Sequence, residues 1–102
     1  MKGRMDEGED MEFMESFMRV ILNQIAVRDW SDKHFACMVW PDHAYPETTW
    51  NALKKRWSDG NVKRRRHIKL EDARRMAVAF GLSLGALVAM AEADLMTRRF
   101  SR

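Results

Sequence analysis

The sequence is poor in the features that mark secreted and membrane proteins. Cys37 is the one cysteine among 102 residues, which excludes an intramolecular disulfide framework and fits a reducing compartment. No run of about 18 apolar residues occurs, so a membrane-spanning helix is excluded. The first ten residues are polar and acidic where a signal peptide would be apolar. We therefore expect a cytoplasmic protein.

The chain is also short. Its 102 residues correspond to one small domain, and a domain of this size buries only roughly 60–65% of its unfolded surface. Hydrophobic residues make up 46% and charged residues 32%, a globular composition rather than a disordered one. So small a core leaves little room for a catalytic cleft, and we expect neither enzymatic activity nor a cofactor.

Charge is distributed unevenly along the chain. Residues 1–16 hold two basic and six acidic side chains, which gives them a net charge of −4. Because the whole chain has a net charge of +3, residues 17–102 carry +7. Residues 54–75 alone hold ten basic against three acidic side chains, which again gives +7. Basic charge this concentrated favours a polyanionic partner, most often nucleic acid.

Apolar residues recur at intervals of three and four, the spacing of helices that bury one face. The predicted helices cover about 10–28, 32–39, 47–57, 69–80 and 84–96. Ser31 and Ser83 are expected to cap the second and fifth of them, and Gly81 to end the fourth. We find no strand pattern and no internal repeat. The chain is therefore predicted to be all-α.

The same spacing predicts which side chains are buried. The expected core residues of the first, second and fourth helices are Met14, Phe17, Met18, Ile21, Leu22 and Ile25; Phe35, Cys37, Met38 and Val39; and Leu70, Ala73, Met76, Ala77 and Phe80. We expect residues 1–10 to be a disordered acidic tail, 11–97 the folded domain, and 98–102 a frayed C-terminal tail.

The third predicted helix has two contrasting faces. Trp50, Leu53 and Trp57 share one side and are expected to be buried. The other side presents hydrogen-bonding groups and positive charge, with no acid after Glu47: Thr48, Asn51, Ala52 and Lys55, flanked by Thr49 and Arg56. Such a face suits the major groove of duplex DNA, which admits one α-helix.

A longer motif follows this helix. Residues 70–87 read LEDARRMAVAFGLSLGAL and resemble the end of phage-repressor-like (Xre-type, lambda-repressor-like) helix-turn-helix domains, which typically read Leu-Ala-x-Ala-Leu-Gly-Val-Ser-Leu there. Residues 57–60, Trp-Ser-Asp-Gly, look like the family's Trp-Glu-x-Gly, and Phe35-Ala36 look like its Leu-Ala pair. The resemblance covers about residues 15–90.

Three positions depart from the family pattern. Asp32 stands where many relatives carry a glutamine that contacts the DNA backbone, and a carboxylate there would repel phosphates. The segment from Ala36 to Trp57 is longer than usual, and Lys69 stands where a serine or threonine cap is common. These differences affect the expected docking on DNA more than the expected five-helix fold.

The resemblance implies a sequence-specific DNA-binding regulator of transcription, a repressor that binds a palindromic operator as a two-fold homodimer. Carried onto this sequence, the third helix reads bases through Thr48, Thr49, Asn51, Ala52 and Lys55. Phosphates are bound by Arg56, Lys63, Arg64, Arg65 and Arg66. The apolar fifth helix offers a dimer interface through Leu84, Val88, Ala91 and Leu95.

Three alternatives remain open. An antitoxin or adaptor would keep the fold but act on a protein partner such as a toxin, through the acidic, methionine-rich N-terminus and the fifth helix. His34, Cys37 and His43 have the residue types of a zinc site, but Cys37 is expected in the core, so we expect no metal. RNA binding is disfavoured, because no aromatic platform lies among the basic residues.

Overall fold

A computed structural model describes the backbone of residues 2–58 and 68–100 and the side chains of 12–57 and 68–100. Within these ranges the chain is all-helical and has no strand. Its five helices are α1 (Lys2–Val27), α2 (Asp32–Val39), α3 (Pro46–Ser58), α4 (Leu70–Ala79) and α5 (Leu84–Phe100). The all-α prediction is therefore confirmed for the described residues.

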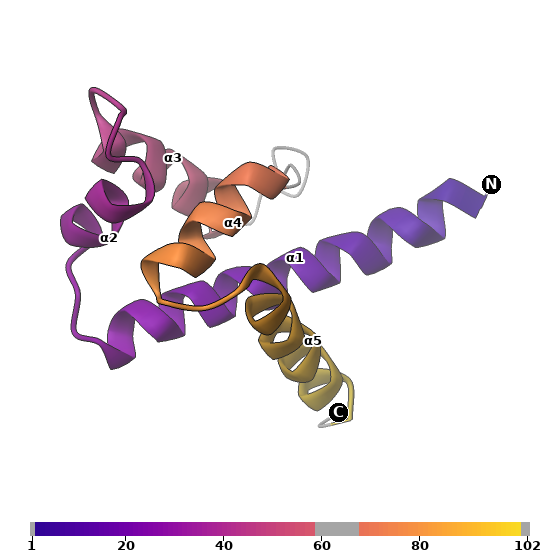
Figure 1. Cartoon of the computed structure of the whole chain (residues 1–102). Helices are drawn as coiled ribbons and strands as arrows, with labels where there is room; N and C mark the ends of the chain where they lie inside the picture. Colours follow the sequence, from indigo (N-terminus) through magenta and orange to yellow (C-terminus); the bar gives the residue numbers. More distant parts are fainter. Residues whose placement is uncertain (1, 59–67, 101–102) are drawn as a thin grey trace.

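The helices form two groups around the long α1 (Figure 1). α5 packs against α1, while α2 packs against both α3 and α4. α3 also contacts α1, and α4 contacts α5, so the two groups share one core. No single helix in the described part of the chain is long and apolar enough to cross a membrane; α4 and α5 reach that composition only together, across a 97° bend.

Two helices extend beyond their predicted ends. α1 begins at Lys2 rather than near Asp10, and the Lys, Arg, Met and Glu residues of this added segment are good helix formers. α5 continues to Phe100, which corrects the frayed tail predicted from residue 98. Two arginines anchor this last turn, because Arg98 donates to Ser16 and Arg99 pairs with Glu12 on α1.

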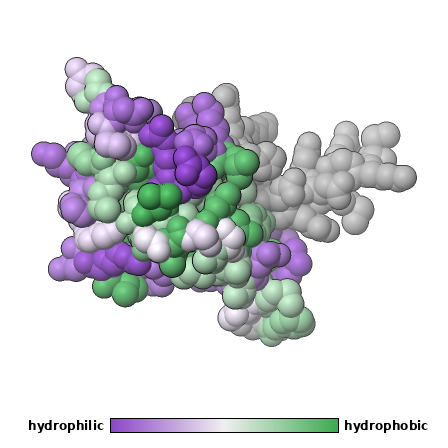
Figure 2. All heavy atoms as spheres, in the orientation of Figure 1, coloured by the Kyte–Doolittle hydropathy of each residue, from purple (hydrophilic) through white to green (hydrophobic). Residues whose placement is uncertain are grey.

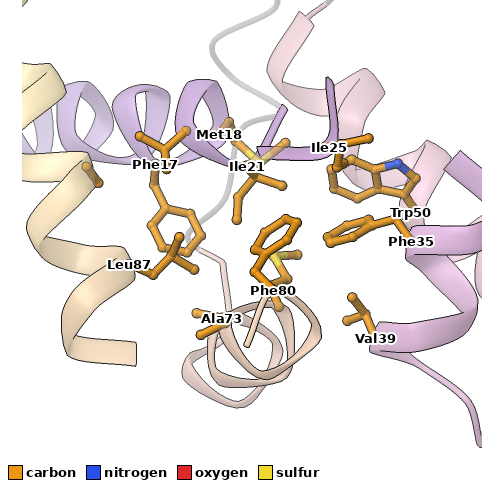
Figure 3. Packing of buried hydrophobic residues seen from close by; sticks show 14 of the residues in the cluster. Phe17, Met18, Ile21, Ile25, Phe35, Val39, Trp50, Ala73, Phe80 and Leu87 are labelled. Carbon is orange, nitrogen blue, oxygen red and sulfur yellow. The ribbon is translucent and has the colours of Figure 1, made fainter. Parts of the chain in front are cut away.

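Aromatic rings from α2, from α3 and from the end of α4 meet at the centre of the core (Figure 3). The Phe35 ring stacks on Phe80 with 5.2 Å between centroids and meets Trp50 edge-on at 4.9 Å. Ile21 and Trp50 are completely buried beside them. Each aromatic pair adds about 0.5–1.5 kcal/mol beyond the area that it buries, so α2, α3 and α4 are held by a common cluster.

Four predicted core residues are exposed. Cys37 and Met38 lie on the outer side of α2, because the buried positions of that short helix are Phe35, Ala36 and Val39. Leu70 is 74% exposed since it is the first residue of α4, ahead of the turn that packs. Leu22 is 43% exposed on α1. These four predictions were wrong.

The predicted capping residues Ser31, Gly81 and Ser83 are confirmed. The Ser31 hydroxyl accepts from the His34 backbone N–H and the Ser83 hydroxyl from that of Ala86, both at 3.0 Å. Gly81 has φ +74°, a conformation that side-chain-bearing residues rarely adopt. Lys69 makes no side-chain cap hydrogen bond, as its residue type predicts.

Candidate nucleic-acid interface

The two faces of α3 are separated as the sequence predicts. Trp50 is completely buried, Trp57 is 8% exposed and Leu53 is half-buried. The residues predicted to face DNA lie on the opposite side: Thr48, Asn51, Ala52, Lys55 and Arg56 are exposed. Thr49 is half-buried, and its hydroxyl donates to the Tyr45 carbonyl at 3.4 Å. Thr49 therefore contributes to the start of the helix more than to its outer face.

Asp32, the first residue of α2, binds the inner side of α3. Its carboxylate accepts a hydrogen bond from Trp50 Nε1 at 2.9 Å and another from Lys54 Nζ at 2.7 Å. The hydrogen bonds from Lys54 and Trp50 lower the pKa of Asp32 below its ordinary 3.8. Its negative charge is thus used inside the α2–α3 contact, in two hydrogen bonds with α3.

A second indole–carboxylate pair joins α2 to α4. Trp40, directly after α2, is 1% exposed and donates from Nε1 to Asp72 at 3.0 Å. The buried indole N–H thereby gains an acceptor, which avoids a cost of about 1–3 kcal/mol for an unsatisfied donor. Together with the Asp32–Trp50 pair, this contact orients α2 relative to both helices that pack on it.

The basic residues of α4 are engaged with acids. Arg75 pairs with Asp42 at 3.0 Å and with Glu71 at 3.3 Å, and Arg74 pairs with Glu71 at 3.2 Å. These arginines lower the pKa of the Asp42 and Glu71 carboxyls, and the two acids raise the pKa of Arg75. The positive charge of residues 54–75 is therefore partly balanced within the fold, as it also is at Lys54.

The predicted phosphate-binding residues are only partly placed. Arg56 is exposed at the end of α3, beside the base-reading face. Lys63, Arg64, Arg65 and Arg66 lie outside the described residues. Lys33, which is not among the predicted site residues, is exposed on α2 and lines a depression of about 270 Å³ with Cys37, Tyr45 and Thr48.

The predicted dimer residues on α5 differ in exposure. Ala91 is completely buried, so within this fold it is not on the surface. Leu84, Val88 and Leu95 are half-buried. α1 covers one side of α5, and this contact accommodates much of the apolar surface that the sequence left without a partner.

The histidines and the cysteine of the zinc alternative are exposed side chains of α2 and the loop after it. The His34 ring packs edge-on against Trp30, and the His43 ring stacks on Trp40. Across residues 12–57 and 68–100, no group of three or more His, Cys, Asp or Glu side chains is placed to hold a metal ion. Cys37 is exposed rather than buried, which corrects the reason given for expecting no metal.

Comparison with known proteins finds no relative: no protein-family model, curated protein or solved structure matches the chain.

Proposed function

We propose that this protein is a lambda-repressor-like helix-turn-helix regulator that binds duplex DNA, with α2 and α3 as its helix-turn-helix unit. α3 is the recognition helix that enters the major groove. Asn51 and Lys55 read base edges, since an asparagine pairs bidentately with adenine and a lysine donates to guanine. Thr48 and Ala52 complete the reading surface, and Arg56 binds phosphate.

The observation that carries this proposal is the separation of the two faces of α3. Trp50 anchors one face in the core, and Asp32 binds both Trp50 and Lys54. The other face is exposed, polar and positively charged beyond Glu47. A rigidly held helix with such an outer face has the shape and the sign of charge that the major groove requires.

The adaptor alternative is supported by exposed apolar residues, on the predicted fifth helix and elsewhere, but not by the predicted N-terminal residues that the structure describes. Phe13 and Met14 on α1 are packed against the core rather than displayed for a partner. Exposed apolar side chains lie on α5, at Met96 and Phe100, and also on α2 and α4, at Met38 and Val78, which line a groove between these two helices. Figure 2 shows hydrophobic surface gathered near the middle of one face. A protein partner is the second candidate function.

The salt dependence of DNA binding tests the proposal. If each protomer of a dimer neutralises three or four phosphates, log Kd plotted against log salt concentration should have a slope of magnitude roughly 5–7. Fluorescence anisotropy with a labelled duplex, at several salt concentrations, measures it. Binding that ignores salt, or no binding at low salt, would contradict the proposal.

The residues of α3 should also divide by role. We expect Asn51→Ala to change which base pairs are preferred, at a cost of about 1–3 kcal/mol at the affected position. Arg56→Ala should weaken all sequences alike, because a phosphate contact carries no sequence information. Selection of sites from a random DNA pool, repeated with each variant, separates the two effects; an unchanged preference for Asn51→Ala would move the reading surface elsewhere.

The proposed dimer uses the exposed parts of Leu84, Val88 and Leu95 on α5. Two recognition helices could then read half-sites about 34–36 Å apart. Light scattering at micromolar concentration should give twice the chain mass of 12.0 kDa, and Val88→Glu should restore the single mass without unfolding the chain. Val78→Glu, on exposed α4 surface, is the matched control. A wild-type mass of 12.0 kDa at every concentration tested would exclude the dimer.

A further inference from the structure

A pocket of about 230 Å³ lies where α1 meets the C-terminal ends of α3 and α5. It contains none of the residues predicted to read DNA. Met18, Leu22 and Trp57 form its apolar wall. Ligand sites usually measure about 300–1,000 Å³, so this one admits a ligand about the size of one substituted ring.

Among the described residues, Arg98 is the cation of this pocket that has no carboxylate within ion-pair distance. Its guanidinium donates to the Ser16 hydroxyl at 3.0 Å, a neutral group that is completely buried. This hydrogen bond holds the half-buried guanidinium of Arg98 at the wall of the pocket. Glu15 also lines the pocket but has an interaction of its own.

The two other cations of the pocket already have carboxylate partners. Arg19 pairs with Asp94 at 3.2 Å, and Lys54 pairs with Asp32 at 2.7 Å. They make the surroundings positive without needing a further anion. Arg98 is therefore the cation that is placed to bind the anionic group of a ligand.

We propose that this pocket binds a small aromatic monocarboxylate. The ring lies against Trp57 and Met18, and the carboxylate binds the Arg98 guanidinium. A guanidinium matches a carboxylate through two parallel hydrogen bonds, and such charge-assisted bonds are stronger than neutral ones. Partial burial of Arg98 strengthens the attraction, because the surrounding protein screens it less than bulk water does.

Occupation of the pocket also acts on α3. Lys54 belongs both to the pocket and to the contact of Asp32 with α3. A ligand bound there lies against Lys54 and disturbs its ion pair with Asp32, which weakens the contact of α2 with the recognition helix. This consequence rests on the proposed DNA binding, whereas the ligand site itself does not.

Nuclear magnetic resonance of the full chain, without DNA, tests the site with benzoate and its neutral analogue benzamide. Each of the four tryptophans gives its own indole N–H signal, and the signal lost in Trp57→Phe identifies that of Trp57. We expect benzoate to shift the Trp57 signal saturably and to bind at least tenfold more tightly than benzamide. Equal binding of the two compounds, or shifts confined to other indoles, would overturn the proposal.

Two arginine variants provide the matched comparison. Arg98→Met keeps the length of the side chain, and we expect it to lose the preference for benzoate over benzamide. Arg74→Met, on exposed α4 and away from the pocket, should keep that preference. If Arg98→Met retained it as well, the carboxylate would not be bound by Arg98. If circular dichroism shows that Arg98→Met does not fold, the relative affinity of the wild type for benzoate and benzamide still tests the proposed site.

Discussion

Polar side chains hold both the α2–α3 contact and the α1–α5 contact, but they leave different surfaces behind. Between α2 and α3, the carboxylate of Asp32 binds Trp50 and Lys54, so the cations on the outer face of α3 remain at the surface. Between α1 and α5, the cations themselves make the contact, since Arg98 binds Ser16 and Arg99 binds Glu12. The first contact thus pairs one lysine of the inner side of α3 with an acid of α2, whereas the second is made by two arginines near the end of α5.

This difference teaches that clustered basic residues in a sequence overstate the charge available to a partner. Among the basic residues of 54–75 that the structure describes, Lys54, Arg74 and Arg75 are paired with carboxylates. Arg56 and Lys69 are exposed. Position on the outer face of α3, rather than total charge, is therefore the stronger argument for an interface.

Trp50→Ala should break the α2–α3 contact with the largest effect. Trp50 is completely buried against Phe35, and removing such a ring costs about 3–5 kcal/mol of the free energy of unfolding. Chemical denaturation measures the loss. Phe100→Ala, which removes an 80% exposed aromatic ring, should change stability by less than about 0.5 kcal/mol. Similar losses for both variants would contradict the described core.

Asp32→Ala should have a smaller effect on the same contact. It leaves the buried Trp50 N–H without its acceptor, at a cost of about 1–3 kcal/mol in the free energy of unfolding at pH 7. Asp32→Asn keeps an oxygen for that N–H and should cost less. Denaturation of the three proteins under identical conditions checks the order; if Asp32→Asn were the less stable variant, the indole hydrogen bond would not be the main contribution.

The pH dependence of stability in the wild type and Asp32→Asn tests whether the charge of Asp32 contributes. Because the pKa of Asp32 lies below 3.8 in the folded chain, its ionised form adds stability above about pH 3.8, and this is lost as the pH falls through the folded pKa. The stability difference between the wild type and Asp32→Asn should therefore narrow below about pH 3.8. A difference that stays constant down to acidic pH would show that the charge of Asp32 contributes nothing.

Of the α1–α5 and α2–α3 variants, Arg99→Ala should have the smallest effect on the free energy of unfolding. The Arg99–Glu12 pair is 3.1 Å long and its side chains are 43% and 37% exposed, and exposed pairs contribute about 0.2–1 kcal/mol. A double-mutant cycle with Glu12→Ala isolates the pair energy, which should fall further at high salt. A coupling above this range would mean that the α1–α5 contact depends on the pair more than its exposure indicates.

Periodicity predicted the parts of this fold in which one helix face decides burial. α2 has its predicted bounds, and Trp50 and Trp57 are buried opposite the polar residues of α3. The caps at Ser31 and Ser83 were also predictable, because a hydroxyl just before an apolar helical run has a local role. Such signals depend only on neighbours along the chain.

The remaining features depend on contacts between distant residues. Periodicity did not distinguish Cys37 and Met38 from the buried side of α2, since an eight-residue helix offers too few turns to define its inner face. The role of Asp32 follows from residues 18 and 22 positions further along the chain. Part of the candidate site, Lys63–Arg66, lies outside the described residues.

The hydrogen bonds between α1 and α5 also bear on the order in which the chain folds. They join residues 75 to 87 positions apart, whereas Asp32 reaches its partners on α3 across 18 and 22 positions. The entropy lost on closing a loop grows with its length, and contacts close in sequence favour rapid folding. We therefore expect α2 and α3 to associate first, and the pairing of α1 with α5 to bring the two ends of the chain together last.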